Sequence, residues 1–133
     1  MFDRLFNSTK ILEKSLNATW ARNEAISQNL ANVETPGYKR KDVPFEQRLK
    51  EAMDNATSVN SNHTDTSKIN IDDIDISVEE DNSALSMRLD GNNVDPDSEA
   101  AQLAKNSIKY NVLTDALNSK YKSLRTVITE GRR

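Results

Sequence analysis

The residue with the greatest potential for acid, base or metal chemistry is His63, the only histidine among 133 residues. It stands in the polar stretch 60–67, where no neighbouring spacing supplies the partners that a catalytic base or a metal ligand needs. The chain also has no cysteine, which excludes disulfides, thiolate catalysis and cysteine-ligated zinc by residue type. We therefore predict that His63 is a surface residue.

The oxygen-rich segment 90–99 is the other candidate for chemistry, as a calcium loop. An EF-hand loop needs an oxygen ligand at its fifth position and glycine at its sixth, where this chain has Val94 and Asp95. The sequence also lacks a glycine-rich phosphate loop and a nucleophile beside a base. We predict that the protein is not an enzyme and assign no catalytic, cofactor-binding or metal-ligating residue.

Charge and length limit the classes of partner. The 18 basic and 21 acidic residues give a net charge of -3. The basic cluster Lys39-Arg40-Lys41 is too short to create a strong field for nucleic acid. No apolar run is long enough to span a membrane, and the first residues lack the pattern of a cleavable signal peptide. We expect one modest domain.

A long helix is predicted for the N-terminal segment, residues 1–34. Apolar residues recur there at alternating steps of three and four, the pattern of a coiled-coil seam, and neither glycine nor proline interrupts it. The seam residues that we expect to mediate assembly from this helix are Leu5, Leu12, Leu16, Ile26 and Leu30.

The middle segment, residues 35–95, is predicted to contain a turn, a linker and a small extended or β part. It begins at Thr35-Pro36-Gly37, because proline disfavours the helical conformation at Thr35 and a Pro-Gly pair suits the centre of a type II turn. A short helix is expected over residues 46–53.

Two strands are predicted further along the middle segment. Apolar residues alternate with polar ones over residues 69–78, with one extra residue at Asp72-Asp73, and again over residues 85–89. The first run has the pattern of a strand with a bulge, and the two runs are expected to pair as a small hairpin.

A second long helix is predicted for residues 96–133. Asp95 can cap its start, Pro96 occupies the position where proline is tolerated, and acidic residues fill its first turn. Its seam residues, which we also expect to mediate assembly, are Leu103, Tyr110, Leu117, Leu124 and Ile128.

These patterns predict a mainly α protein whose two long terminal helices form a coiled-coil-like pair, with a small β-hairpin or irregular segment between them. Hydrophobic residues make up only 35% of the chain, so we expect helices of neighbouring molecules to cover the remaining faces. Trp20 lies off the seam and would be buried in a layer of many helices. The alternative is that the middle segment folds over Trp20.

Two stretches of sequence resemble a known family. The run from Ser27 to Lys39, SQNLANVETPGYK, resembles the signature of flagellar rod and hook proteins, approximately S-x-N-I/L-A-N-x-x-T-P-G-Y. The run from Asp90 to Asp95, with Glu99 and residues 106–110, resembles the proximal-rod members of that family. The residues that match the signature turn are Asn29, Asn32, Thr35, Pro36, Gly37 and Tyr38.

The resemblance implies a structural subunit of the bacterial flagellar basal body, in a proximal rod that assembles through its terminal helices and transmits torque. The implied partners are copies of this chain, rod and basal-body proteins of the FliE and FlgC types, and the flagellar type III export apparatus. It places the protein in the periplasmic rod, exported without a cleaved signal peptide. The alternative, from the helical pattern alone, is a soluble coiled-coil adaptor or an export-chaperone-like binding module.

Overall fold

The computed structural model describes residues 2–57, 71–81 and 89–131, without the side chains of residues 2–6 and 56–57. His63, Leu85 and Met87 therefore lie outside the described residues. The elements in chain order are α1 (Phe2–Ala31), β1 (Lys41–Asp42), α2 (Phe45–Thr57), the 3₁₀ helix η2 (Ile71–Asp73), β2 (Glu79–Glu80) and α3 (Pro96–Glu130). The predicted mainly α fold class is confirmed.

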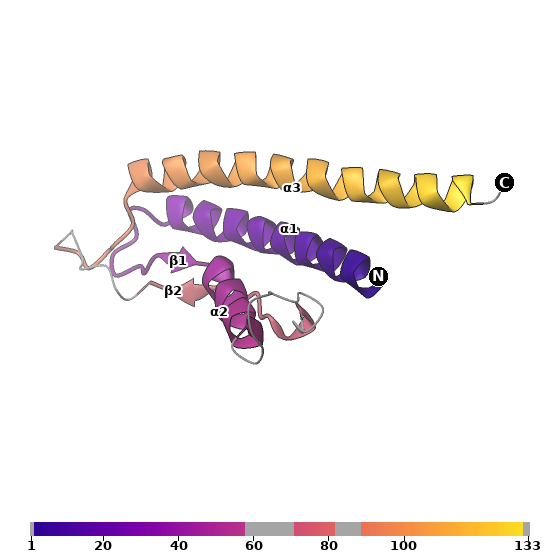
Figure 1. The fold of residues 1–133 in the computed structure, drawn as a ribbon. Helices are drawn as coiled ribbons and strands as arrows, with labels where there is room; N and C mark the ends of the chain where they lie inside the picture. Colours follow the sequence, from indigo (N-terminus) through magenta and orange to yellow (C-terminus); the bar gives the residue numbers. More distant parts are fainter. Residues whose placement is uncertain (1, 58–70, 82–88, 132–133) are drawn as a thin grey trace.

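The two terminal helices lie side by side and run in opposite directions (Figure 1). As predicted, Asp95 caps α3, its carboxylate accepting a 3.1 Å hydrogen bond from the Asp97 backbone N–H, and Pro96 is the first helical residue. α3 ends at Glu130, where the Gly131 N–H donates to the Val127 carbonyl.

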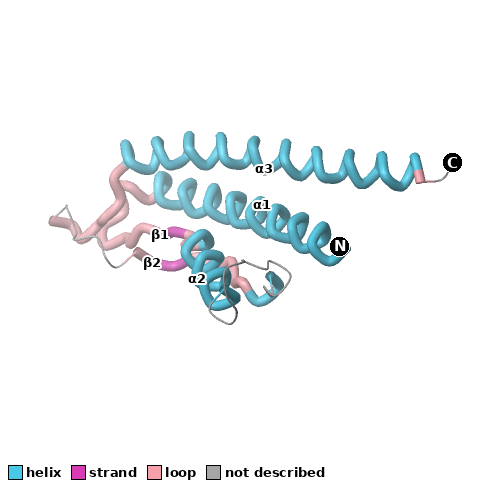
Figure 2. Tube along the Cα trace, viewed as in Figure 1, coloured by secondary structure: helices cyan, strands magenta, loops and turns pink. Residues whose placement is uncertain are grey.

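The middle segment covers the other side of α1, so that α1 is the central element (Figure 2). The expected short helix is present as α2, longer than predicted. Arg48 ties α2 to the returning chain by donating to the Asp75 carbonyl at 2.9 Å and to the Ser77 hydroxyl at 2.7 Å.

The predicted hairpin of residues 69–78 with 85–89 is wrong where the structure describes it. Residues 71–73 form a 3₁₀ turn, and the small antiparallel sheet pairs β2 with β1, in the register Lys41 with Glu80 and Asp42 with Glu79. The reason is the spacing of Ile71 and Ile74, which a tight turn places on one face against the core. Lys14 holds this turn by donating to the carbonyls of Asp72 and Ile74 at 3.0 and 2.6 Å.

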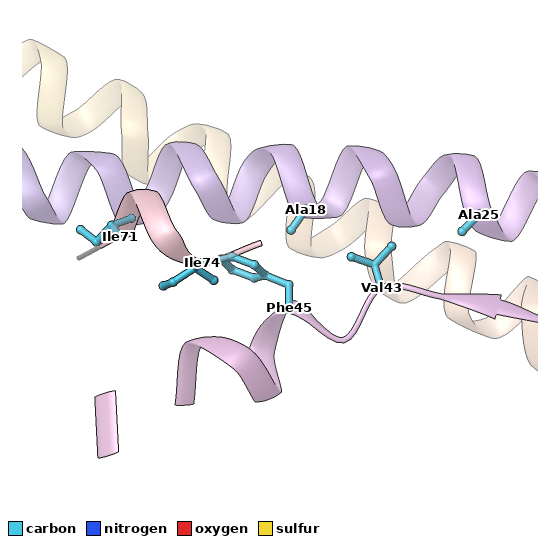
Figure 3. Close-up of a cluster of buried hydrophobic side chains, with 6 residues drawn as sticks. All are labelled: Ala18, Ala25, Val43, Phe45, Ile71 and Ile74. Carbon is cyan, nitrogen blue, oxygen red and sulfur yellow. The ribbon is translucent and has the colours of Figure 1, made fainter. Parts of the chain in front are cut away.

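The hydrophobic core lies between α1 and the middle segment. Figure 3 shows its side chains, with Val43 and Phe45 projecting toward the α1 face that carries two alanines. Alanine has so small a side chain that the linker can approach α1 closely. The buried members of this core are Ala18, Ala25, Val43, Phe45, Ile71 and Ile74.

The interface between α1 and α3 has a different composition. Ile26 is buried on α1, but the two buried residues of α3, Glu99 and Asn106, are polar. Asn106 donates a 2.8 Å hydrogen bond to the backbone carbonyl of the buried Thr19. The helix pair is therefore positioned by polar contacts at one end rather than by a continuous apolar seam.

Candidate assembly site

The signature turn packs against a second turn from the far side of the middle segment. Tyr38 N–H donates to the Thr35 carbonyl at 3.3 Å, and Gly37 has φ +72°, as a type II turn requires. Gly37 N–H donates to the Asp90 carbonyl at 2.9 Å. Gly91 has φ +80°, and a Cβ there would lie 3.8 Å from the Gly37 Cα. The two glycine turns therefore lie against each other.

Asn29 joins α1, the chain after the turn and α3. Its amide donates to the Lys41 carbonyl at 2.8 Å and to the Glu99 carboxylate at 3.0 Å. Its carbonyl oxygen accepts from the Lys41 N–H at 2.9 Å and from the Tyr38 hydroxyl at 3.2 Å. Two donated and two accepted bonds use the full capacity of an asparagine side chain. Asn29 is completely buried, which is possible because all its hydrogen-bonding groups have partners.

Glu99 is a completely buried carboxylate that is paired with a mostly buried arginine. It accepts from the Arg40 Nε at 2.6 Å, and Arg40 also contacts Asp81 at 3.2 Å. Burial opposes the charge of Arg40, but the hydrogen bond and charge of Glu99, with Asp42 and Asp81, raise the pKa of Arg40. Each charge therefore needs its partner, because an unpaired buried charge is costly.

Asn92 holds the turn that follows α1 from a distant part of the chain. Its amide donates to the carbonyls of Asn32, Val33 and Thr35 at 3.0, 2.9 and 3.0 Å. These three residues follow Ala31, the last residue of α1, so one buried side chain fixes the turn after the helix from 57 to 60 residues away in the sequence. We call Asn29, Arg40, Asn92 and Glu99 the polar lock.

The structure brings the predicted signature residues together at this lock, with different roles. Asn29 and Tyr38 make tertiary contacts, and Gly37 bonds the second turn. Asn32 stays local, donating to the Gln28 carbonyl at 2.8 Å and accepting from the Thr35 hydroxyl at 3.2 Å. Burial and the charges of Glu99 and Glu80 raise the pKa of the Tyr38 hydroxyl, which keeps it protonated as a donor.

Sequence reasoning missed Arg40, Asn92 and Glu99 as members of the lock. The sequence pattern places Glu99 in the acidic first turn of α3 and Arg40 in the basic cluster Lys39-Arg40-Lys41, and neither pattern predicts a buried ion pair. One signal was available: Glu99 and Asn106 lie seven residues apart and extend the α3 seam stripe toward its start. Polar residues at seam positions mark specific pairing.

The predicted seam residues have unequal environments. Ile26 is buried, whereas Tyr110 and Ile128 are exposed in the single chain. Leu5 lies in α1, but its side chain is outside the described residues. The remaining seam residues are half-buried and are Leu12, Leu16, Leu30, Leu103, Leu117 and Leu124.

A second set of charges ties α2 to both long helices. Glu46 of α2 accepts from Arg22 of α1 at 2.8 Å and also from Lys109 of α3. The hydrogen bond from Arg22, with further help from Lys109, lowers the pKa of Glu46 to about 2. This triad lies nearer the turns than the chain termini along the helix pair, beside a groove of about 500 Å³ that Lys105 also lines.

A second groove, of about 270 Å³, opens where Trp20 lies, between α1 and α3. Trp20 is 66% exposed, so the middle segment does not cover it in the described part of the chain. No group of three or more acidic, histidine or cysteine side chains suited to a metal is present among the described residues. No helix within those ranges is long and apolar enough to cross a membrane.

Comparison with known proteins gives a consistent result. The chain is 35% identical over 130 residues to the flagellar basal body rod protein FlgB of Bacillus subtilis, covering 96% of this chain and 98% of the relative. It is 33% identical over 141 residues to FlgB of Escherichia coli K12 and 31% identical over 140 residues to FlgB of Salmonella typhimurium LT2. Each of these alignments covers 98% of this chain and 99% of the relative. No family model matches the chain.

Proposed function

We propose that this chain, which belongs to the FlgB family of flagellar basal body rod proteins, builds the proximal rod through its paired terminal helices. As a member of this family, it is a structural component of the flagellar basal body rod and not an enzyme. The proposal concerns how the chain assembles, which neighbours it contacts and how it carries load.

The observation that carries the proposal is the exposed apolar surface of the helix pair. A monomer of this size rarely leaves so many large apolar side chains in water along one pair of helices unless they bind something. The exposed set on these helices is Trp20, Ile108, Tyr110, Val112, Tyr121, Val127 and Ile128. Neighbouring subunits in a rod would cover it.

The polar lock supports a load-bearing role. Buried, fully paired polar groups permit one arrangement of two helices and penalise others. A subunit whose helices hold a fixed angle presents the same surfaces at each position of a repeating assembly. We propose that the lock, the signature turn and the seam residues serve assembly and torque transmission in this way.

The partners and the route follow from the same proposal. We expect the chain to contact copies of itself and rod proteins of the FliE and FlgC types, and to reach the periplasmic rod through the flagellar type III export apparatus without a cleaved signal peptide. The absence of cysteine supports a periplasmic location, because it removes the risk of unwanted disulfides there.

The test uses Leu117→Asp, a half-buried seam position on α3, in a strain that lacks its own copy of the protein. Purified basal bodies and swimming are measured, with Ser119→Asp, an exposed position on the same helix, as the matched control. We expect Leu117→Asp to abolish incorporation, because an interface would bury an unpaired carboxylate. Normal incorporation of Leu117→Asp would overturn the role of the seam.

A further inference from the structure

Two exposed apolar surfaces lie on different sides of the helix pair. We call the first the Trp20 groove, and its walls are Thr19, Trp20, Asn23, Asn106, Ser107, Tyr110 and Asn111. We call the second the α3 ridge, formed by Ile108 and Val112, which are 65% and 62% exposed. Ile108 and Val112 are four residues apart and therefore adjacent on one helix face.

The Trp20 groove has the features of a surface that is incomplete in one chain. Trp20 forms one wall and offers a large apolar face to solvent. Asn106, which lines the groove, is 4% exposed, and its Oδ1 accepts no hydrogen bond from the described protein. An apolar occupant would cover the face of Trp20 without supplying a donor to Asn106, so the exposed Trp20 face is the feature that argues for an apolar neighbour.

The α3 ridge faces away from α1. Asn106, two residues before Ile108, points at α1 and bonds Thr19, so a helix places Ile108 on the opposite side. The exposed Lys105 flanks the ridge one turn before Ile108 and lines the groove on the side away from Trp20. The ridge is therefore an exposed apolar surface with a basic residue at its start.

The charges beside the two surfaces are complementary. Glu24 lies four residues after Trp20 on the same face of α1, is exposed and accepts a long 3.5 Å hydrogen bond from Gln28. Glu13, seven residues before Trp20, accepts a 2.5 Å hydrogen bond from Tyr121 of the same chain. Glu24 is therefore the carboxylate of this face that is available to the lysine of a neighbour.

We propose that the α3 ridge of one copy seats in the Trp20 groove of the next copy, with Lys105 of the first paired to Glu24 of the second. The inference rests on the proposed function and adds to it the occupant and the register of the contact. Because the two surfaces differ, the contact is head-to-tail, and a head-to-tail contact that does not close into a ring generates an open helical assembly.

The register is consistent with such an assembly. Copies that repeat around an axis along the helices keep their direction, so α3 of one copy runs antiparallel to α1 of the next, as it does within the chain. Moving from Trp20 to Glu24 along α1 then corresponds to moving from Ile108 back to Lys105 along α3. Trp20 meets the ridge and Glu24 meets Lys105 in the same register.

One feature of this register opposes the contact. Asp115, one turn beyond Val112, comes near Glu13 of the neighbouring copy. The bond from Tyr121 turns the Glu13 carboxylate toward its own α3 and reduces the conflict. Asp115→Asn should therefore strengthen assembly slightly, by about twofold, which is the size of one exposed charge contact.

The contact alone is small. A stable interface between two proteins buries roughly 1,200 Å² or more, and one tryptophan with two aliphatic side chains supplies a fraction of that area. The proposal therefore predicts that the dilute protein is monomeric and that copies associate when several neighbours bind together.

The first experiment is cross-linking in assembled rods, using the absence of native cysteine. The double variant Glu24→Cys with Lys105→Cys replaces the only copy in the cell, and purified basal bodies are treated with a short bismaleimide. We expect a ladder of covalent oligomers of this chain. The controls are the two single variants and the double variant Asn118→Cys with Lys105→Cys, which pairs positions on α3 alone. None of these three should give a ladder.

Normal rods without the ladder would overturn the ridge-in-groove contact while leaving the proposed function intact. A cross-link from position 24 or 105 to a different basal-body protein would also overturn it, because the occupant would not be a second copy.

If the double cysteine variant does not assemble, charge-reversal variants test the pairing of Lys105 with Glu24 instead. Glu24→Lys and Lys105→Glu should each reduce incorporation by about fivefold, and the double variant should restore it, as expected for an exposed pair and its like-charge repulsion. Equal incorporation of all three variants, or no rescue by the double variant, would overturn the pairing. Absence of even the wild-type chain from basal bodies would instead reject the proposed function.

Discussion

The two ends of the helix pair are held by different means. At the end near the turns, Asn29, Asn92 and Glu99 are completely buried polar side chains, with their hydrogen bonds made within the chain. At the opposite end, Leu117 and Leu124 are half-buried, and Val127 and Ile128 are exposed. Buried polar groups fix geometry, whereas exposed apolar groups gain from a partner. One end defines the subunit, and the other leaves surface for its neighbours.

This contrast predicts that, in a single chain, the end of the helix pair near the turns is stable and the opposite end is weakly ordered. Short-range helix propensity alone rarely holds a long helix in water, so the outer turns of α3 depend on what packs against them. Four measurements test the difference between the two ends.

The largest effect is expected for Glu99→Ala. The change leaves the mostly buried Arg40 without its 2.6 Å partner and removes a 3.0 Å acceptor from Asn29. The free energy of unfolding should fall by about 3–5 kcal/mol, as for a broken buried ion pair. Urea denaturation measures it, with Asp97→Ala, an exposed residue of the same helical turn, as a control that should change stability by less than about 0.5 kcal/mol. Equal effects of the two variants would contradict the lock.

The next largest effect is expected for Asn92→Ala. Three carbonyls of the turn after α1 lose their bond to the Asn92 amide, those of Asn32 and Thr35 keeping a backbone donor, and the loss should cost about 2 kcal/mol. Asn118→Ala, at an exposed position near the other end of the pair, serves as the control. The amide signals of residues 32–36 should move in an NMR spectrum of Asn92→Ala. An unchanged spectrum would show that the Asn92 bonds do not hold this turn.

Amide exchange compares the two ends directly in the unmodified monomer. Amides of residues 99–106 should exchange at least about tenfold more slowly than those of residues 121–130, because local opening costs more where buried contacts are dense. Hydrogen exchange with mass spectrometry resolves these two segments of α3. Uniform protection along α3 would refute the proposed contrast and would favour a helix pair that is complete without neighbours.

The smallest effect concerns Glu46, between the two ends. Its folded pKa of about 2 lies below the ordinary value of 4.5, so its contribution is fully present above pH 4.5 and is lost as the pH falls toward 2. Because the Glu46 side chain is 48% exposed, we expect less than about 1 kcal/mol. Glu46→Gln should flatten the fall in stability between pH 4.5 and 2. A slope unchanged by that substitution would assign the acid sensitivity to other carboxylates.

The elements that could be predicted from the sequence are those fixed by local chemistry. The spacing of apolar residues indicated both long helices, Asp95-Pro96 marked the start of α3, and Pro36-Gly37 marked the turn. These depend on residues within a turn or two of each other. The local sequence is therefore sufficient to predict these elements.

The elements that could not be predicted depend on distant partners. Nothing near Glu99 indicates that Arg40 lies beside it, because 59 residues separate them. The strand predicted around Ile71 and Ile74 was wrong because a bulged strand and a tight turn give the same apolar spacing over so short a run. The packing of Ile71 and Ile74 against α1 decides between a bulged strand and a tight turn, and the local sequence does not show where α1 lies.

The cap that Asn92 provides has a consequence for the order of folding. The carbonyls that its amide bonds, in the turn after α1, lie up to 60 residues earlier in the chain, and the Glu99 partner of Asn29 lies 70 residues later than Asn29 itself. Contacts that close such long loops form late, after local helix formation. A chain cut short before Asn92 retains the N-terminal signature and the local bonds that end α1, but it lacks the side chains that hold the following turn and join α1 to α3. The lock can therefore form only in a chain that already contains both Asn92 and Glu99, so the angle between the two helices is fixed late in folding.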